Sequence, residues 1–173
     1  MRKESMVTAL TDLLKSRPLS EITVSDLCES CDIPRQTFYY HFDNMMDMFI
    51  WSVMVNLRDD GGRPSFVGGI GDVCEALYSR KELTTAFFSS KYREKILSTM
   101  KEGFEVKAAG YIRDYVVERM SEDVLRFSIL VLVNGSLGII ADWIDDGMDI
   151  SVPDVRKALD ELIRIVIRSD ILE

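Results

Sequence analysis

The chain has 173 residues, of which 47% are hydrophobic and 29% are charged. This is the size and composition of one folded domain, or of a small domain joined to a larger one, and it excludes a disordered or fibrous protein. The formal net charge of −8 at pH 7 argues against a large basic surface that binds nucleic acid non-specifically.

The N-terminal part of the chain predicts three short helices. Apolar residues at spacings of three and four indicate a first helix over residues 4–17, which Pro18 ends. A second helix follows from about residue 24, with Thr23 or Ser25 as its N-cap. Asp32 comes next, at a tight turn where a positive φ is expected and Asp tolerates it. Pro34 then opens a third helix over residues 35–41.

A fourth helix is predicted over about residues 43–58, and it is apolar on nearly all its sides. Such a helix must be covered on several faces, so we interpret it as a connector between an N-terminal head and a C-terminal body. Residues 59–65 contain the strongest cluster of helix-breaking residues in the sequence. The expected division is therefore a domain of residues 1–58 and a domain of residues 59–173.

The second domain is predicted to be entirely helical, so the fold class is all-α. The expected helices cover about residues 70–80, 83–101, 104–119, 122–145 and 153–169. Gly68, Gly69 and Gly71 lie around the start of the first of these and are interpreted as a flexible linker, because no strand and no Lys-Ser/Thr pair accompanies them as in a phosphate-binding loop. The longest charge-free run, residues 127–141, has 15 residues, fewer than the roughly 20 of a membrane span.

Few residues offer catalytic or metal chemistry. Cys28 and Cys31 have the spacing of zinc ligands, but a zinc site needs about four ligands and the chain has only one further cysteine and one histidine. We therefore interpret both as small buried residues and expect all three cysteines to be thiols in a reducing compartment. His41 is not beside a nucleophile. No enzyme activity, metal or cofactor is expected.

Residues 35–42 differ from the preceding predicted helices, because nearly all of their side chains are polar or aromatic. If Phe38 faces the core, the other faces of this short helix carry groups that read DNA: Arg for guanine, Gln for adenine, Thr for the thymine methyl, Tyr and His for phosphates. The alternative is that the aromatic residues only pack against the fourth helix. Four Phe or Tyr residues within Phe38–Phe42 are more than one core-facing stripe of a short helix buries, so we favour the DNA-binding interpretation.

The segments Ile22–Cys28 and Ile33–Phe42 resemble the helix-turn-helix of the TetR/AcrR family of transcriptional regulators, over roughly the first 58 residues. The resemblance implies a three-helix head joined by a connector helix to a helical ligand-binding body, with double-stranded DNA and an unidentified small-molecule effector as partners. It also implies a homodimer formed through the last two helices, about residues 122–145 and 153–169. The N-terminal residues do not support a signal peptide, so a cytoplasmic location is expected. By the family pattern, the DNA contacts fall on Thr23, Ser25, Arg35, Gln36, Thr37, Tyr39, Tyr40 and His41.

Two positions depart from the family pattern. Asp32 stands where a glycine is common, and Met45 stands where a lysine near the start of the fourth helix is common, so one phosphate contact is missing. Residues 1–58 also contain six Lys or Arg against eight Asp or Glu. A dimer needs only a few phosphate contacts per half-site, which Arg2, Lys3, Arg35 and amides at helix starts can supply.

The C-terminal stretch Asn134–Ile144, followed by Gly147, Met148 and Pro153, is similar to the branch of the family that includes dihydroxyacetone-kinase activators. Two hypotheses follow. The first is a homodimeric regulator, a repressor or an activator, that binds a palindromic operator through residues 35–41 and responds to a small molecule in the body. The alternative is a helical co-regulator that acts through a partner protein with little or no direct DNA binding.

Overall fold

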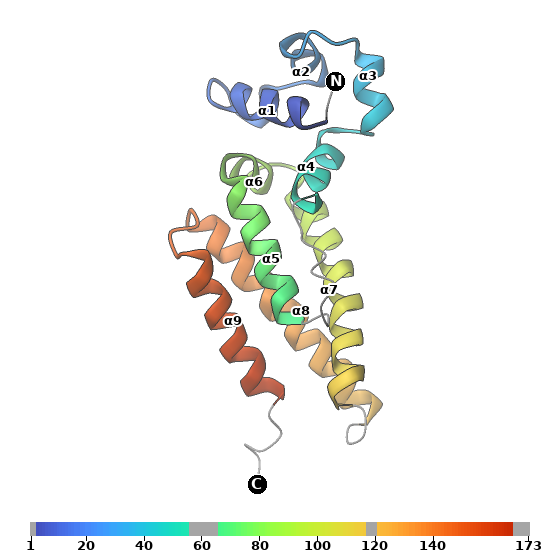
Figure 1. Cartoon of the computed structure of the whole chain (residues 1–173), viewed down its shortest axis with the longest axis vertical. Coiled ribbons are helices and arrows are strands. Elements are labelled where there is room, and N and C mark those ends of the chain that lie inside the picture. Colours follow the sequence, from blue (N-terminus) through green and yellow to red (C-terminus); the bar gives the residue numbers. More distant parts are fainter. Residues whose placement is uncertain (1–2, 56–65, 117–120, 168–173) are drawn as a thin grey trace. The chain divides into compact units, whose positions relative to one another are not determined.

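A computed structural model describes residues 3–55, 66–116 and 121–167, except for the side chains of 66–68, 111–116, 160 and 162–167. Every regular element within these ranges is helical, which confirms the all-α prediction. In chain order (Figure 1) the elements are α1 (Lys3–Leu14), the 3-10 helix η1 (Leu19–Glu21), α2 (Val24–Ser30), α3 (Arg35–His41), α4 (Met45–Met54), α5 (Phe66–Ser79), α6 (Lys81–Phe88), α7 (Arg93–Val116), α8 (Glu122–Asp145) and α9 (Val152–Ile167).

The chain divides into two compact units. Unit 1 contains residues 1–58 and 76–96, and unit 2 contains residues 59–75 and 97–173. Unit 1 therefore takes in a segment that lies beyond the boundary expected at residue 59. The cluster of helix-breaking residues on which that boundary was placed lies mostly in 56–65, outside the described residues.

Helices α2 and α3 form where the local signals predict them, whereas α1 ends at Leu14, before the end predicted at residue 17. Thr23 is the N-cap of α2, and its hydroxyl accepts a hydrogen bond from the amide of Asp26. Asp32 has a φ of 52°, so the turn between α2 and α3 uses the left-handed conformation expected there. Pro34 is the N-cap of α3. These signals act within a few residues of one another, which explains why the sequence predicts this region well.

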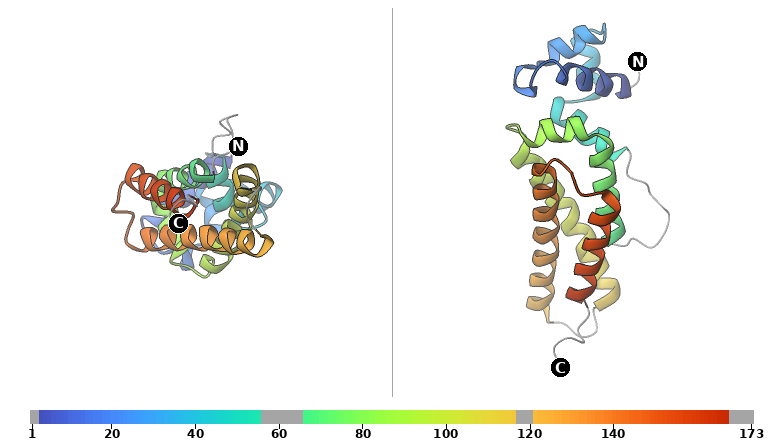
Figure 2. Two further views of the ribbon diagram at one scale, coloured as in Figure 1. Left: turned by 90° about the horizontal axis from the view of Figure 1, so that it is seen from below. Right: turned by 90° about the vertical axis from the view of Figure 1, so that its left-hand side faces the viewer.

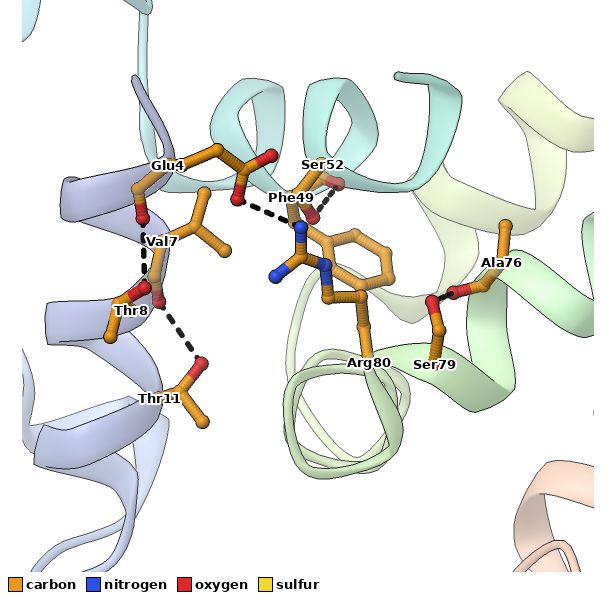
Figure 3. Close-up of polar contacts among 9 residues, drawn as sticks. All are labelled: Glu4, Val7, Thr8, Thr11, Phe49, Ser52, Ala76, Ser79 and Arg80. Atoms are coloured by element: carbon orange, nitrogen blue, oxygen red, sulfur yellow. Dashed lines mark hydrogen bonds and ion pairs between the residues drawn. The ribbon is translucent and has the colours of Figure 1, made fainter. Parts of the chain in front are cut away.

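Residues 76–96 join unit 1 through polar and aromatic contacts. Arg80 Nη2 donates a 2.8 Å hydrogen bond to Glu4 Oε2 on α1, as Figure 3 shows. The ring of Phe87 on α6 stacks on that of Phe49 on α4, with centroids 4.6 Å apart. Both phenylalanines are buried. Helix α6 is thus part of the same hydrophobic core as the helix-turn-helix.

The predicted helix over residues 83–101 is wrong, because the chain turns between α6 and α7. The hydroxyl of Ser90 donates to the Phe87 carbonyl at 2.7 Å and accepts from the Tyr92 amide at 3.1 Å. This side-chain bonding competes with a continuous helix. Helix α7 then begins at Arg93 and runs through the expected break near residue 102.

The linker predicted at Gly68–Gly71 is also wrong, since these residues lie inside α5. Gly71 is buried, and a Cβ at this position would lie 2.4 Å from Nε of Arg156 on α9. Arg156 Nη2 also donates to Asp72 Oδ1 at 2.7 Å. The glycine therefore makes room for a guanidinium that links α5 to α9.

In unit 2, α8 and α9 pack side by side and run antiparallel (Figures 1 and 2). The connection between them turns at Gly147 and Met148, which both have positive φ, and Trp143 Nε1 donates to the Ile150 carbonyl at 2.9 Å. By length and composition α8 is apolar enough to cross a membrane, a test that buried helices of soluble proteins also pass. Its second half, from Leu132 to Ile144, contributes eight buried residues.

Candidate nucleic-acid interface

Helix α3 is anchored by the apolar residues at its centre and its C-terminal end. Phe38 is fully buried and Phe42, the C-cap, is 2% exposed. Their rings contact one another with centroids 5.9 Å apart, and the ring of Phe42 lies 5.6 Å from that of Trp51 on α4. The expected inward orientation of Phe38 is confirmed. One narrow side of α3 is therefore used for packing.

The remaining sides of α3 face outward. Tyr40 is 83% exposed and Tyr39 is 49% exposed. Arg35 and Gln36 are exposed as well, whereas Thr37 and His41 are half-buried. An arrangement in which all the aromatic residues pack against the fourth helix is inconsistent with these exposures. Two large aromatic side chains held in solvent on a helix of two turns form a surface suited to an external partner.

Arg35 and Tyr39 lie one turn apart on α3 and interact directly. Arg35 Nη2 donates to the Tyr39 hydroxyl at 3.4 Å, and the guanidinium carbon lies 5.9 Å from the centroid of the tyrosine ring. The hydrogen bond to Tyr39 raises the pKa of Arg35 above its already high value, so the side chain stays charged. The pair holds a guanidinium and a phenol beside each other on the exposed surface.

The start of α2 carries the other two predicted contacts, Thr23 and Ser25. Thr23 is exposed and Ser25 is half-buried. The Thr23 hydroxyl donates to Asp26 Oδ2 at 2.6 Å and accepts from the Asp26 amide at 3.2 Å. Because this hydroxyl already caps the helix, any contact that it makes with a phosphate would be shared with the cap.

Asp26 completes the cap from the other side. Its carboxylate accepts from the Thr23 amide at 2.7 Å and lies 3.0 Å from Nη2 of Arg17. The hydrogen bonds from Thr23, followed by that from Arg17, lower the pKa of Asp26 to about 2. The carboxylate is therefore ionised at every ordinary pH. One positive charge near α2 is used internally rather than left for DNA.

Among the described residues, few cations lie near α3, which agrees with the excess of acidic residues in 1–58. Met45, at the position where the family commonly has a lysine, is only 7% exposed and opens α4. Lys3 lies nearby, with its ammonium 5.0 Å from the ring of Phe42 and 5.2 Å from that of Trp51. The folded chain thus brings one cation from α1 to the C-terminal end of α3, a placement that the sequence alone does not reveal.

Cys28 and Cys31 lie on α2 and its C-cap. Cys28 is buried and Cys31 is half-buried, and burial raises the pKa of both thiols. No group of three His, Cys, Asp or Glu side chains that could hold a metal ion is found among the described residues. The interpretation of Cys28 as a small core residue agrees with its environment.

A small helical unit that buries one side of α3 and exposes Arg35, Gln36, Tyr39 and Tyr40 defines the class of helix-turn-helix proteins. The family comparison agrees with this class. Residues 7–50 match the model of "Bacterial regulatory proteins, tetR family", and residues 67–164 match that of "Transcriptional regulator C-terminal region". The chain belongs to the TetR family of transcriptional regulators, which are DNA-binding proteins and not enzymes.

Individual relatives match parts of the chain. The transcriptional activator DhaS of the dhaKLM operon of Lactococcus lactis is 36% identical over 55 residues, 28% of this chain and 29% of DhaS. The regulator EthR of Mycobacterium tuberculosis is 28% identical over 99 residues, 49% of this chain and 46% of EthR. The alignments thus span less than half the length of either relative.

Solved structures extend the similarity of fold to nearly the whole chain. The dihydroxyacetone kinase operon activator DhaS superposes with a TM-score of 0.72 at 17% identity, covering 94% of both chains. A TetR regulator from Rhodococcus sp. RHA1 gives a TM-score of 0.53 at 14% identity, also over 94% of both chains. At such identities the comparison establishes the fold alone.

Proposed function

We propose that the chain is a homodimeric transcriptional regulator that binds an inverted-repeat operator through α3. The exposed surface of α3 is the observation that carries this proposal. Arg35 and Gln36 offer the donors that read guanine and adenine in the major groove. Tyr39, Tyr40 and His41 supply further donors, and Thr37 supplies a methyl group for thymine. Thr23 and Ser25 lie at the start of α2, where the helix amides favour a phosphate.

An exposed apolar stripe on α8 supports the homodimer. Val124, Phe127 and Val131 are 48%, 65% and 59% exposed, and their spacing of three and four places them on one side of the helix. Solvent exposure of three large apolar side chains in a row is unfavourable in a single chain. A second copy of α8 that packs on this side would bury them.

Glycines continue the same side of the helix. Gly135 and Gly138 are exposed, and a Cβ at either position would meet nothing within 4 Å. Glycine inside a helix costs roughly 1 kcal/mol relative to alanine, and within the described residues the packing of the single chain gives no reason for glycine here. A close approach of a partner helix supplies that reason. We therefore place the dimer contact on α8, with α9 beside it.

We further propose that a small-molecule effector binds within the helical body and changes operator affinity, as the family resemblance implies, and that the protein acts in the cytoplasm. The relative DhaS is named a transcriptional activator.

A second candidate function keeps the fold but makes the chain a co-regulator that acts through a partner protein. The charge of residues 1–58 favours it, because eight Asp or Glu outnumber six Lys or Arg and Met45 is buried in place of a lysine. A co-regulator would form a stable complex with another protein and select no DNA sequence.

The deciding experiment is the selection of binding sites from random duplex DNA by the purified full chain. We expect an enriched inverted repeat, and we expect Arg35→Ala and Tyr39→Ala each to weaken binding by about 1–3 kcal/mol. Ser5→Ala, an exposed substitution on α1, is the matched control and should bind as the parent does. Enrichment that survives both α3 substitutions would contradict operator binding through α3, and no enrichment at all would favour the co-regulator.

Salt dependence provides a further check on direct DNA contact. Each phosphate contact that a cation makes releases counterions, so the logarithm of the association constant falls linearly with the logarithm of salt concentration. Because unit 1 places few cations near α3, the slope should be modest for a regulator of this size.

A further inference from the structure

Unit 1 contains a half-open groove that is lined by no residue of α3, although Thr23, one of the proposed DNA contacts, lies on its lining. It lies between the end of α1, η1 and the start of α4 on one side and α6 with its following turn on the other, and its cavity volume is about 920 Å³. Its lining is mainly apolar and includes Leu14, Leu19, Ile22, Met45 and Ala86. Pockets for small molecules commonly have volumes of 300–1,000 Å³ and an apolar lining.

Cations stand at the edge of this groove. Lys15, Lys81 and Lys91 line it, against a single carboxylate, Glu82. Lys15 is neutralised by Asp12, whose Oδ1 lies 2.7 Å from its Nζ. The groove therefore has a positive rim in a chain whose net charge is −8.

Lys81 and Lys91 are not neutralised in the same way. Their ammonium groups lie 5.8 Å from the ring of Tyr78 and 5.4 Å from that of Tyr92. In the part of the chain that the structure describes, neither ammonium forms an ion pair. A cation over an aromatic ring keeps donors available for an anion. The two lysines flank α6, one at its first residue and one just beyond its end.

We propose that this groove binds a small amphipathic carboxylate, with its hydrocarbon part on the apolar lining and its carboxylate at Lys81 or Lys91. The volume favours a small molecule, and the combination of an apolar lining with two unpaired ammonium groups favours an anion with an apolar body. A cationic molecule of the same shape would meet these ammonium groups with like charge. A neutral one would gain only the apolar contact.

The site would lie beside the elements that hold α3. Ile22 immediately precedes Thr23, the N-cap of α2, and Met45 is the first residue of α4. A ligand in the groove that contacts both would change operator affinity to the extent that it binds one arrangement of the helix-turn-helix more tightly than another. This site is in unit 1 and is distinct from the effector site proposed for the body. Binding in the groove does not depend on the proposed function, whereas an effect on operator affinity does.

The test is a two-dimensional amide NMR titration of the full chain with decanoate, and with decyltrimethylammonium as the cationic probe of equal chain length. We expect decanoate to shift amides of residues 14–23, 45 and 81–92 with saturation. The double substitution Lys81→Gln and Lys91→Gln should raise the Kd for decanoate about tenfold, because charge-assisted hydrogen bonds to the carboxylate are lost. Lys157→Gln, an exposed lysine on α9, should leave the Kd unchanged.

Several outcomes would overturn the proposal. Saturating shifts confined to unit 2 would place the amphiphile elsewhere. Equal binding of both amphiphiles, or no change in Kd in the double variant, would remove the role of the lysines. Shifts of the groove amides on concentrating the chain without amphiphile would show that a second copy covers the groove. None of these readings requires DNA, so a chain that fails to bind an operator still tests the groove.

Discussion

Arg80 donates a 2.8 Å hydrogen bond to the carboxylate of Glu4, 76 residues earlier in the chain. The Arg80 side chain is 22% exposed and that of Glu4 is 47% exposed. Arg80 Nε is buried without a hydrogen-bond partner among the described atoms, so the guanidinium is only partly compensated. The pair ties α1 to the segment that enters α6, and it therefore fixes the part of unit 1 that the sequence assigned to the body.

Removing Glu4 should destabilise unit 1. We expect Glu4→Ala to lower the free energy of unfolding by about 1 kcal/mol, because a largely buried guanidinium loses the carboxylate with which it pairs, while the exposure of Glu4 limits the effect. Urea denaturation followed by circular dichroism measures it. Asp12→Ala breaks the ion pair between Asp12 and Lys15, whose side chains are 60% and 68% exposed respectively. It should change the free energy of unfolding much less than Glu4→Ala does. Equal losses in both variants would contradict the special role of Glu4.

The cap at the start of α2 predicts a pH dependence. The pKa of Asp26 is lowered to about 2 in the folded chain, from 3.8. A lowered pKa means that the ionised form stabilises the fold, so this stability is complete above about pH 4 and is lost as the pH falls toward 2.

Asp26→Asn should therefore be less stable than the parent at pH 7, and the difference should shrink between about pH 4 and pH 2. Thermal unfolding at a series of pH values tests this. The substitution Glu29→Gln, on the same helix and exposed, is the control and should show no such trend. If the difference in stability between Asp26→Asn and the parent stays constant across this range, the charge of Asp26 does not stabilise the cap.

The exposed stripe on α8 predicts the oligomeric state. Phe127→Asp places a charge where the proposed dimer buries an aromatic ring, and we expect it to shift the dimer to monomer in sedimentation velocity at micromolar concentration. Val106→Asp on α7 is the matched control, since Val106 is 75% exposed and lies outside the stripe. A parent chain that sediments as a monomer, or a Phe127→Asp variant that remains dimeric, would remove α8 from the interface.

The cysteines should differ in reactivity. Burial raises the pKa of Cys74 to about 12 and raises that of Cys28 and Cys31. Because the thiolate is the reactive form, we expect slow reaction of the native chain with a disulfide reagent at pH 8, with Cys31 first because it alone is half-buried. Mass spectrometry of partly labelled protein identifies the order. Fast labelling of Cys74 in native buffer would show that its surroundings open readily.

Two substitutions of Tyr39 distinguish the contribution of its hydroxyl from that of its aromatic ring. Tyr39→Phe removes the acceptor for Arg35 at 3.4 Å but keeps the ring under the guanidinium, so we expect it to weaken operator binding less than Tyr39→Ala does. Electrophoretic mobility shifts with the selected operator measure both. If Tyr39→Phe binds as poorly as Tyr39→Ala, the hydroxyl itself is the critical group.

The sequence alone determined α2, α3 and the turn between them. Thr23, Asp32 and Pro34 act on their immediate neighbours, and the spacing of Phe38 and Phe42 fixes which side of α3 is buried. Such signals depend on backbone chemistry within one or two turns, so they survive without knowledge of the rest of the fold. The family motif lies in the same segment, and for that reason the class of protein was predictable too.

Only the tertiary structure decided which distant segments share a core. The ring of Phe87 stacks on Phe49, and Arg80 pairs with Glu4, so residues 76–96 belong with the helix-turn-helix. Gly71 lies inside α5, although glycine-rich sequence ordinarily indicates a linker, and a guanidinium from α9 occupies the space beside it. The ammonium of Lys3 lies near the C-terminal end of α3, over the rings of Phe42 and Trp51. Each of these contacts joins residues far apart in the chain, and local propensity carries no information about a partner that only folding brings near.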